Sequence, residues 1–527
     1  MSRNLPTGIQ DVEVIREDNL VYVDKTAIIH KLITGTQTTY FLSRPRRFGK
    51  SLLCSTLQAI YEGRRELFQV MGDFPALAID SLDWKWKKHP VIRIDLSAEN
   101  YTEGVTAINS ILTFQIESQS KRLGIKLTYE SIGNKFKELI MKAHEKYKER
   151  VVVIIDEYDK PLLDTIDDAE LHKKVRNILK AFYGTLKSLG IHLSFRFLTG
   201  ITKFSHVSVF TDLNNITDLT FDPNYADLCG LTQEEIEKNF EPEINTVIAE
   251  TGKTREIYLQ ELKNFYNGYR FTKQPLNVFN PYGLLHHFRS KGLFNSYWYE
   301  TGSPSFLINL IKNQKINLLK LGNMEVGFES FNYFDLENMD ALAVLCQTGY
   351  LTIKEFDTKF QIVTLDYPNL EVKSSFAKSL VKLYLSPPSH TADTLLTSLP
   401  KSLYEGDVNK ALHTIKSYLA SIPYDIIIDD KEKYFQTAIH IIFTIFGLLC
   451  RSEVRIANGR IDTLVETGNY IYCFEFKMDE SAEKALVQID SKEYLLPFQN
   501  TGKMLFKIGV SFDSKDRNIK EWVVATH

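Results

Sequence analysis

Four apolar runs in the first 200 residues have the pattern of strands that are buried in a sheet. They span residues 39–43, 90–96, 151–155 and 192–198. The run from Val151 to Ile155 consists of β-branched residues alone, which indicates burial on both faces. Segments with apolar residues at helical spacing separate the runs, for example at 53–61. The pattern therefore predicts an α/β domain with a central parallel sheet.

Beyond residue 230 the pattern becomes helical. Thr232 and Glu235 have the spacing of a capping box, which predicts a helix start ahead of Ile236. Aromatic-rich segments follow at 265–271, 278–281, 297–302 and 347–352. They suit a packed helical core with a small β element, and a lid or a binding surface is the alternative. The residues from Pro387 to Thr391 break the pattern and predict a linker.

The C-terminal part predicts a helix followed by a β-hairpin. Residues 433–450 have an apolar helical face, and extended structure resumes at 452–456. A short turn at 467–469 joins predicted strands at 459–466 and 470–477, and 506–512 has the pattern of a further core strand. We therefore divide the chain into residues 1–230, a mostly helical middle at 231–385, and an α/β domain at 395–527.

Composition and charge suit a globular protein of several domains. The chain has 527 residues, of which 44% are hydrophobic and 24% charged. Its formal net charge is −3, so nucleic acid would have to bind through a local basic patch. The run from Trp84 to Lys88 interleaves aromatic and basic residues and is one candidate patch. A solvated loop is the alternative for that run.

Cysteine usage and apolar run lengths favour the cytoplasm. The five cysteines lack C-x-x-C spacing, which suits reduced core thiols better than disulfides or zinc. The N-terminus has no apolar signal region, and the apolar run from Ala438 to Cys450 is too short to span a bilayer. We therefore expect no membrane partner.

The loop after the first predicted strand has the ending of a phosphate-binding loop. Gly49 permits close backbone approach, Lys50 suits the β- and γ-phosphates, and Ser51 suits Mg²⁺. Arg44 stands where the general motif has its first glycine, so guanidinium charge is expected to replace part of the backbone cradle. The alternative is a basic loop that caps a helix. We assign ATP binding to Arg44, Arg46, Arg47, Phe48, Gly49, Lys50, Ser51 and Leu52.

The ends of two later strands supply further candidates. Asp156 and Glu157 follow the β-branched run and would lie at the carboxyl edge of the sheet, beside the loop. Asp156 is expected to hold Mg²⁺ with Ser51, and Glu157 to polarise the attacking water as general base. A polar turn without function is the alternative. The strand ending at Leu198 delivers Thr199 or Thr202 as a sensor of the γ-phosphate.

A second site is expected in the C-terminal hairpin. Glu475 and Lys477 share one face of a strand, and the short turn can bring Asp462 beside Glu475. Two carboxylates at one point bind Mg²⁺ or Mn²⁺, and the lysine could orient or help deprotonate a water and stabilise phosphate charge. The alternative is a solvated strand face with alternating charges.

Five motifs together resemble the bacterial AAA-ATPase-like family. They lie at residues 5–9, 22–26, 43–51, 155–159 and 213–218. The resemblance covers nearly the whole chain, and it implies that the arginine-rich loop is the family's own form. Members typically carry a C-terminal PD-(D/E)XK nuclease-like domain. Asp462, Glu475 and Lys477 resemble the D…(E)xK signature of such domains. The expected fold is thus a P-loop NTPase, a helical middle and a restriction-endonuclease-like α/β domain.

The same resemblance adds residues to the second site. Gln488, with Tyr494 beyond it, resembles the helix residues of exonuclease-type members of the nuclease superfamily. Glu432 resembles the superfamily's helix-borne metal-binding acid, and Glu453 competes with it for that role.

The sequence as a whole predicts ATP-linked cleavage of nucleic acid. The cofactors are ATP and Mg²⁺, with Mn²⁺ as an option at the nuclease site, and DNA is favoured over RNA as partner. A homo-oligomer is compatible with the sequence. One alternative is a nucleotide-dependent signalling switch whose nuclease-like domain only binds nucleic acid or a partner. Another is an interaction scaffold without catalysis.

Overall fold

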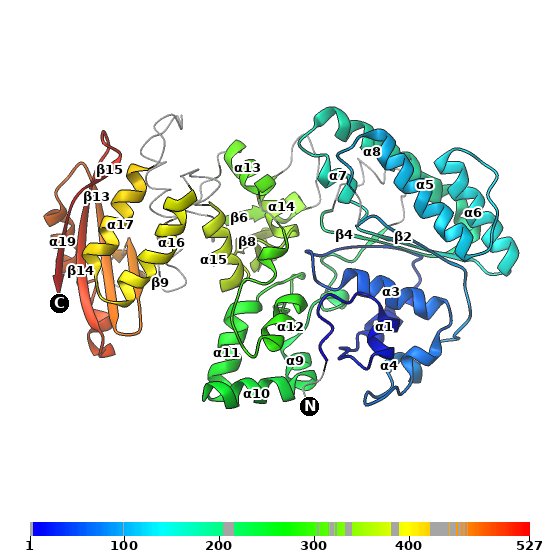
Figure 1. Cartoon of the computed structure of the whole chain (residues 1–527), viewed down its shortest axis with the longest axis horizontal. Helices are drawn as coiled ribbons and strands as arrows, with labels where there is room; N and C mark the ends of the chain where they lie inside the picture. Colours follow the sequence, from blue (N-terminus) through cyan, green and yellow to red (C-terminus); the bar gives the residue numbers. More distant parts are fainter. Residues whose placement is uncertain are drawn as a thin grey trace. The chain divides into compact units, whose positions relative to one another are not determined.

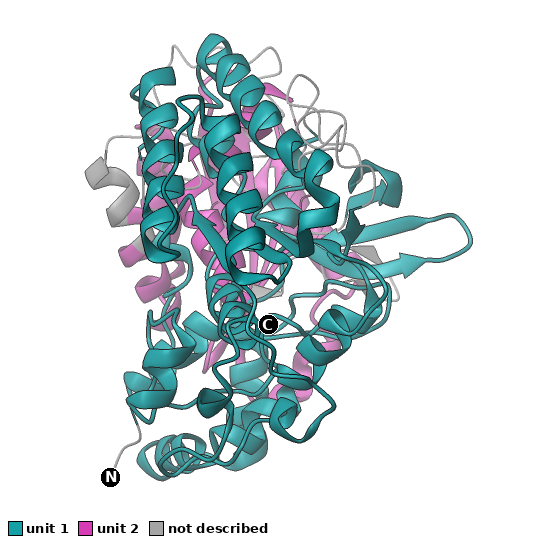
Figure 2. Ribbon diagram, turned by 90° about the vertical axis from the view of Figure 1, so that its right-hand side faces the viewer, with its two compact units in different colours: residues 1–301, 323–369 teal, residues 302–322, 370–527 magenta. Residues whose placement is uncertain are grey.

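A computed structural model of the chain divides into two compact units. It describes residues 4–97, 100–203, 216–302, 305–314, 316, 321, 324–331, 340–380, 389–421, 442, 450–451, 455–456, 459–460 and 462–526. Unit 1 comprises residues 1–301 and 323–369, and unit 2 comprises residues 302–322 and 370–527 (Figure 2). Each unit is therefore discontinuous in sequence.

Unit 1 is built on a parallel sheet. Its strands are β1 (Thr39–Ser43), β2 (Val91–Asp95), β3 (Val151–Asp156), β4 (Leu193–Gly200) and β5 (Thr217–Asp218). They lie in the order β2-β3-β4-β1-β5, and every neighbouring pair is parallel. All six residues of β3 are buried, as its β-branched sequence predicted. The predicted central parallel sheet is thus confirmed, and its carboxyl ends meet at one edge.

Helices cover both faces of this sheet (Figure 1). One side carries α1 (Val12–Glu17), α3 (Lys50–Tyr61) and α4 (Ala78–Ser81), and the other carries α5 (Val105–Arg122), α6 (Ile132–Tyr147) and α8 (Ala169–Gly184). Two shorter helices are α2 (Thr26–Ile33) and α7 (Lys160–Asp164). α3 follows β1 directly, so the loop between them lies at the carboxyl edge of the sheet.

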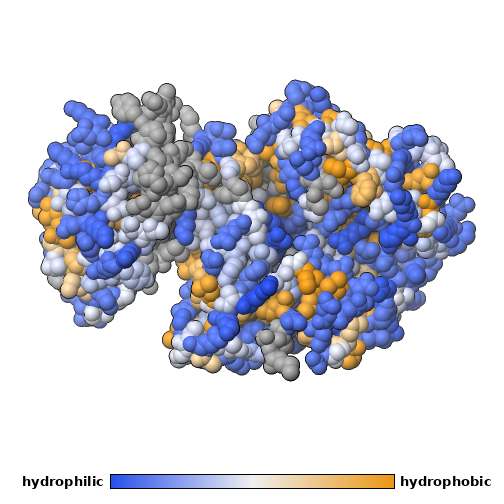
Figure 3. Space-filling model, in the orientation of Figure 1, coloured by the Kyte–Doolittle hydropathy of each residue, from blue (hydrophilic) through white to orange (hydrophobic). Residues whose placement is uncertain are grey.

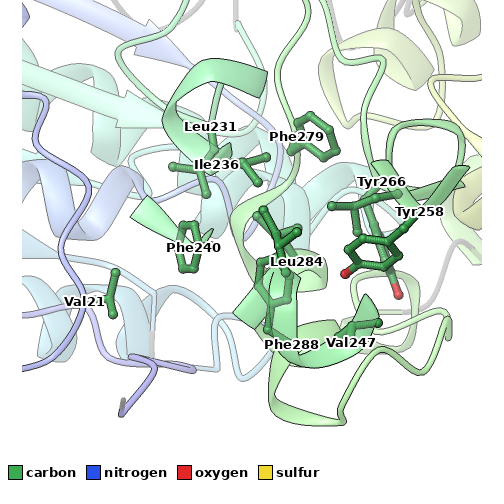
Figure 4. Packing of buried hydrophobic residues seen from close by; sticks show 12 residues of the cluster. Val21, Leu231, Ile236, Phe240, Val247, Tyr258, Tyr266, Phe279, Leu284 and Phe288 are labelled. Carbon is green, nitrogen blue, oxygen red and sulfur yellow. The ribbon is translucent and has the colours of Figure 1, made fainter. Parts of the chain in front are cut away.

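The helical middle region shares a core with the N-terminal segment. Its helices are α9 (Gln233–Asn239), α10 (Glu241–Thr251), α11 (Arg255–Tyr266) and α12 (Pro281–Arg289). The capping box starts α9, with Thr232 and Glu235 bonded reciprocally. Val21 packs in one buried cluster with Phe240, Leu284 and Phe288 (Figure 4). This core joins residues on both sides of position 230 into unit 1, and the boundary at 230/231 stays a prediction.

The predicted small β element completes unit 1. It consists of β6 (Met324–Gly327), β7 (Thr352–Asp357) and β8 (Ile362–Asp366), which form an antiparallel sheet in the order β6-β8-β7 beside α14 (Ala341–Gln347). Hydrogen bonds attach it to the helical region, because the Arg270 amide donates to Thr352 Oγ1 and Asn369 Nδ2 donates to the Asn267 carbonyl. Tyr269, Phe279, Trp298 and Tyr350 are buried, so the described aromatic residues of this region serve mainly as core.

Unit 2 contains a mixed sheet in the order β15-β14-β13-β12-β9. The strands are β9 (Cys450–Arg451), β12 (Thr463–Glu466), β13 (Tyr470–Met478), β14 (Met504–Asp513) and β15 (Asn518–Thr526). Its helices are α13 (Ser305–Asn313), α15 (Leu370–Ser379), α16 (Ser389–Tyr404), α17 (Val408–Ala420) and α19 (Ala482–Ser491). β13 and β14 pair in parallel, and α19 connects them. The sheet with its helices matches the predicted C-terminal α/β fold.

Two local predictions differ from the structure of unit 2. The single strand predicted at 459–466 is divided, because β11 (Gly459–Arg460) pairs with β10 (Arg455–Ile456) in a separate ribbon, whereas β12 joins the main sheet. The predicted linker residues Ser389 to Thr391 form the first turn of α16. Pro387 and Pro388 lie outside the described residues, as does most of the helix predicted at 433–450.

The face of the molecule shown in Figure 3 is mainly hydrophilic. Hydrophobic patches are scattered among the hydrophilic side chains of this face. Within the described ranges, every helix is too short or too polar to cross a bilayer.

Candidate nucleotide and metal sites

The loop between β1 and α3 turns through two left-handed residues. Arg47 has φ 64° and Gly49 has φ 90°. A Cβ at position 49 would meet no atom within 4 Å, so glycine is favoured there by its backbone conformation and not by crowding. α3 begins at the next residue, Lys50. The loop thus ends where Lys50 and Ser51 enter the first helical turn, as the sequence predicted.

Lys50 is buried and held by three oxygens. Its Nζ donates to the carbonyls of Arg44 and Pro45, both at 3.2 Å, and lies 3.2 Å from Glu157 Oε1. Burial alone would lower the pKa of Lys50, but the carboxylates of Glu157, Asp156 and Asp159 outweigh it and raise the pKa. The ammonium therefore stays charged and already occupies the place between loop and strand end that a phosphate would share.

Asp156 ends β3 as a fully buried carboxylate. Arg93 Nη2 lies 3.7 Å from its Oδ2, and neither oxygen has a hydrogen-bond partner among the described residues. Burial is the larger cause and the charge of Glu157 the next, and together they raise the pKa of Asp156 to about 6. The neighbouring Ser51 side chain lowers this pKa, but only enough to offset part of the rise. A buried carboxylate that is this poorly compensated and lies beside a serine hydroxyl fits Mg²⁺, which prefers oxygen ligands.

Arg44 has a different position from the one expected for a phosphate ligand. Its guanidinium is buried and donates to the carbonyls of Ser43, Thr220 and Tyr225 at 2.9, 2.9 and 3.1 Å. It also lies 4.3 Å from the ring centroid of Phe271. Burial lowers the pKa of this guanidinium to about 10. Arg44 ties the strand end to the segment after β5, and a role in phosphate binding would require those bonds to break.

The other loop arginines lie on aromatic side chains. Arg46 stands 5.2 Å from the Trp298 ring centroid and donates to Tyr350 Oη at 3.0 Å. Arg47 stands 5.0 Å from the ring of Tyr282 and is exposed. Phe48 is buried edge-on to Tyr269 and Phe271. The loop is therefore anchored on residues of the middle region, which sequence reasoning did not anticipate.

The turn after Glu157 is fixed by Asp159. This buried carboxylate accepts from the amides of Ile201 and Thr202 and from Thr202 Oγ1. A Cβ at Gly200 would lie 2.3 Å from Asp159 Oδ1, so the close approach requires glycine. Thr199 is also buried and donates to the Leu42 carbonyl at 2.8 Å. Both candidate sensor hydroxyls thus have protein partners, and contact of either with a γ-phosphate stays a prediction.

A cavity of about 510 Å³ opens above the loop. Phe48, Gly49, Lys50, Ser51, Leu52 and Glu157 line it, as do Arg46 and Arg47. Its lining cations are Lys25, Arg46, Arg47, Lys50 and Lys160, whereas Glu157 is the one carboxylate among the described lining residues. Asp156 lies behind this wall, beside Ser51. The apolar wall includes Ile9, Val23, Phe240, Tyr282 and Leu285.

The apolar wall contains residues that residue-by-residue reasoning missed. Ile9 and Val23 belong to motifs that carry the family resemblance but were assigned no role in binding, and Phe240 comes from the end of α9. Lys25 links the N-terminal segment to α9 of the middle region, because its Nζ binds both carboxylate oxygens of Glu235 at 2.6 and 2.7 Å. A part-buried ion pair between such distant residues has no signal in a single sequence.

In unit 2 the hairpin brings Asp462 beside β13. Thr463 pairs with Phe474, and one step further along this antiparallel register Asp462 comes opposite Glu475. The exposed Asp462 carboxylate accepts from the Phe476 amide at 3.0 Å. This contact fixes the acid at the strand edge, as the predicted hairpin required.

Glu475, Lys477 and Gln488 form one hydrogen-bonded group. Gln488 Nε2, on α19, donates to Glu475 Oε1, and Lys477 Nζ donates to Gln488 Oε1 at 2.6 Å. Lys477 Nζ also lies 3.5 Å from Glu475 Oε1. Gln488 Nε2 reaches Tyr494 Oη at 3.4 Å. The structure thus brings together the acid, the lysine and the helix residue that the sequence singled out.

Glu475 retains one buried oxygen for another ligand. Its Oε2 is buried without a hydrogen-bond partner among the described residues. Burial, followed by the charge of Asp462, raises the pKa of Glu475 to about 7, and Lys477 opposes the shift. Within the described ranges no group of three or more His, Cys, Asp or Glu side chains forms a metal cage. The two acids fit a cation that takes its remaining ligands from phosphate and water.

Other candidates lie elsewhere or outside the description. Glu432 and its rival Glu453 lie outside the described residues. The rings of Trp84 and Trp86 pack against Tyr61 and Phe68, so both rings are engaged within the protein, and binding of nucleic acid by the run from Trp84 to Lys88 stays a prediction. Cys54, Cys229, Cys346 and Cys473 are buried free thiols, as expected.

Comparison with known proteins identifies two families and one full-length relative. The family described as predicted AAA-ATPase matches residues 6–210, and the PD-(D/E)XK nuclease superfamily matches residues 430–522. A protein of Azotobacter chroococcum mcd 1, named an uncharacterized protein in the vnfD 5' region, is 34% identical over 533 residues. The match covers 99% of each chain. These families are the ones that the sequence motifs resemble, and the resemblance is confirmed.

Proposed function

Because this chain belongs to the predicted AAA-ATPase family and carries a domain of the PD-(D/E)XK nuclease superfamily, we propose that it couples ATP hydrolysis to Mg²⁺-dependent cleavage of nucleic-acid phosphodiester bonds. DNA is the favoured substrate over RNA. Buried free thiols support a reducing compartment such as the cytoplasm.

One observation, shared by both sites, carries this proposal. Asp156 in unit 1 and Glu475 in unit 2 are buried carboxylates, and each has at least one oxygen without a hydrogen-bond partner among the described residues. Such an oxygen is costly unless a ligand binds it. A lysine stands beside each acid, Lys50 in one case and Lys477 in the other. Carboxylate and lysine together suit a metal-bound phosphate.

The nucleotide cavity supports ATP as the ligand of unit 1. Five cations and one carboxylate line it, although the whole chain has a net charge of −3. A polyanion is therefore attracted to the cavity. The apolar wall of Ile9, Val23 and Leu285 offers a surface for a nucleobase and its sugar. A nucleoside triphosphate combines both properties.

In this proposal each residue of unit 1 has a defined role. Lys50 binds the β- and γ-phosphates, and Ser51 and Asp156 would hold Mg²⁺. Glu157 accepts a proton from the water that attacks the γ-phosphorus. Phosphate entry first requires Lys50 to share its contacts with Glu157, which releases that carboxylate toward the water.

In unit 2 the residues act on a phosphodiester. Asp462 and Glu475 would hold Mg²⁺ or Mn²⁺, and the ion when bound would supply positive charge and an activated water. Lys477 stabilises the developing charge on the phosphate or orients the attacking water. Gln488 positions Lys477 and Glu475 relative to each other through its two hydrogen bonds.

The proposal is tested by separating the two sites. Glu157→Gln should retain ATP but fail to hydrolyse it, whereas Glu475→Ala should abolish cleavage without a change in ATP turnover. Both variants are assayed on single-stranded and duplex DNA and on RNA, with Mg²⁺ and with or without ATP. The proposal is wrong if the wild-type protein cuts none of these nucleic acids.

A switch function is favoured by one observation and is the second candidate. The proposed general base Glu157 is paired with Lys50 at 3.2 Å, and turnover would be slow in a protein that keeps this pair after nucleotide binding. In that case nucleotide stays bound with little hydrolysis, and the nuclease-like domain only binds nucleic acid or a partner. Single-turnover ATP hydrolysis, measured beside dissociation of labelled nucleotide, distinguishes this function from the first.

A further inference from the structure

We propose that Lys160 is a second phosphate-binding lysine of the nucleotide cavity, and that it contacts the γ-phosphate so that the site distinguishes ATP from ADP. This inference rests on the proposed ATP-binding function. Lys160 begins α7 and lines the cavity together with Lys50, Ser51 and Glu157. Sequence reasoning gave it no role.

The backbone places Lys160 one turn beyond Glu157. The Lys160 amide donates to the Glu157 carbonyl at 3.0 Å, and the Tyr158 amide between them donates to the Thr199 carbonyl at 3.0 Å. Asp159, the preceding residue, is locked by its bonds to Ile201 and Thr202. Lys160 is therefore carried on a rigid turn at the same sheet edge as the proposed general base.

The present partner of Lys160 is easily replaced. Its Nζ lies 2.5 Å from Asp164 Oδ2, one helical turn further on. The side chains of this pair are 31% and 26% exposed, and ion pairs of this kind hold weakly because water screens them. A γ-phosphate carries more charge than Asp164 and can take the ammonium at little cost.

The remaining candidates for the terminal phosphate are engaged elsewhere. Lys25 is held by Glu235, Arg46 by Tyr350, and Arg47 lies over Tyr282. The partners of all three cations belong to the middle region. The hydroxyls of Thr199 and Thr202 are buried and donate to protein oxygens. Lys160 is the cation that, with Lys50, stands on the β3 side beside Glu157.

The test compares ATP with ADP. The full-length wild-type protein and Lys160→Met are titrated with ADP and with a non-hydrolysable ATP analogue, both in Mg²⁺, by calorimetry. Loss of one charge-assisted contact should weaken binding of the analogue by about tenfold or more, whereas ADP affinity should stay nearly constant. Lys160→Arg keeps the charge and should retain most of the preference for the triphosphate.

Asp164→Asn is the matched control. It removes the present partner of Lys160, so affinity for the triphosphate analogue should stay equal or rise. An equal loss of both nucleotides in Lys160→Met, or no loss of either, overturns the role of Lys160 while nucleotide binding by the wild type stands. If the wild type binds neither nucleotide, the ATP-binding function fails and this inference fails with it.

Discussion

The nucleotide cavity takes its lining from residues between Pro6 and Thr301, whereas the described members of the proposed nuclease site lie between Asp462 and Tyr494. Part of the cavity wall is at the same time part of the core of unit 1, since Val21 and Phe240 belong to both the cavity lining and one buried cluster. The nuclease group stands on one hairpin and one helix. Substitutions should therefore couple binding to stability in the first site and leave them separate in the second.

The largest expected effect is on the shared core. Phe240 is 1% exposed and stacks on Phe288 with ring centroids 5.3 Å apart. Phe240→Ala should lower the free energy of unfolding of unit 1 by about 3–5 kcal/mol and should also weaken ATP binding. Thermal unfolding and nucleotide titration measure the two effects. Ile257→Ala, at a side chain that is 53% exposed, is the control, and a stable Phe240→Ala variant would contradict the shared-core view.

The nuclease site should lose activity without loss of stability. Lys477→Met removes a charge that stabilises the transition state, so cleavage should fall roughly a hundredfold to a thousandfold. The thermal midpoint should hardly change, because methionine keeps the packing of the aliphatic part of Lys477, a side chain that is 23% exposed. Lys484→Met on α19, at a side chain that is 65% exposed, should leave cleavage unaffected. A clear drop in the thermal midpoint of Lys477→Met would mean that activity and stability are coupled in the nuclease site as well, and would contradict the contrast between the two sites.

The pH dependence of stability should reveal the buried acid of unit 2. The pKa of Glu475 rises from 4.5 to about 7 on folding, so between these values the folded chain binds more protons than the unfolded chain. Without metal, stability is then lost as pH rises through this window, by at most about 3 kcal/mol. Thermal midpoints from pH 4 to 8 measure the loss. Mg²⁺ should restore stability above pH 7, where the ionised carboxylate binds it.

Asp156 and Asp159 titrate in part of the same range, since burial raises both of their pKa values. The Glu475→Gln variant keeps the carboxyl groups of Asp156 and Asp159 and removes only that of Glu475. The wild-type curve minus the Glu475→Gln curve should therefore slope downward with pH. A flat difference would mean that Glu475 ionises normally in the folded chain.

The smallest expected effect concerns the exposed part of the cavity. Arg47 lines it but lies over Tyr282 at the surface, so Arg47→Ala should weaken ATP binding only about threefold to tenfold. Stability should not change. Lys291→Ala, at a side chain that is 75% exposed and outside the cavity, controls for net charge. If Arg47→Ala lost as much ATP affinity as Phe240→Ala, binding would depend on the exposed rim of the cavity as much as on its buried wall.

The difference between the sites also explains what the sequence could predict. The alternation along β13 places Glu475 and Lys477 on one face, and the short turn at 467–469 fixes the partner strand. The period of a strand and the length of a turn therefore suffice for most of that site. The β-branched run of β3 likewise predicts the centre of the parallel sheet, because its burial follows from the residues themselves.

The remainder depends on contacts between distant segments. Arg44 looked like a charged loop residue, but its guanidinium is bonded to carbonyls of Thr220 and Tyr225, which only the folded chain brings near. Lys25 and Glu235 are 210 residues apart. The tertiary fold determines which distant residues form such pairs. Neither secondary-structure propensity nor the spacing of residues in the sequence predicts them.

Because unit 1 is discontinuous in sequence, the parts of its nucleotide site are synthesised at different times. The last residue that lines the cavity is Thr301, but Tyr350, which holds Arg46 of the loop, is made only after residues 302–322 of unit 2. A nascent chain thus possesses the cavity lining before it possesses Tyr350, one of the residues that anchor the phosphate loop. Because domains fold as they emerge, nucleotide binding should mature late in synthesis, after translation has passed the last segment of unit 1.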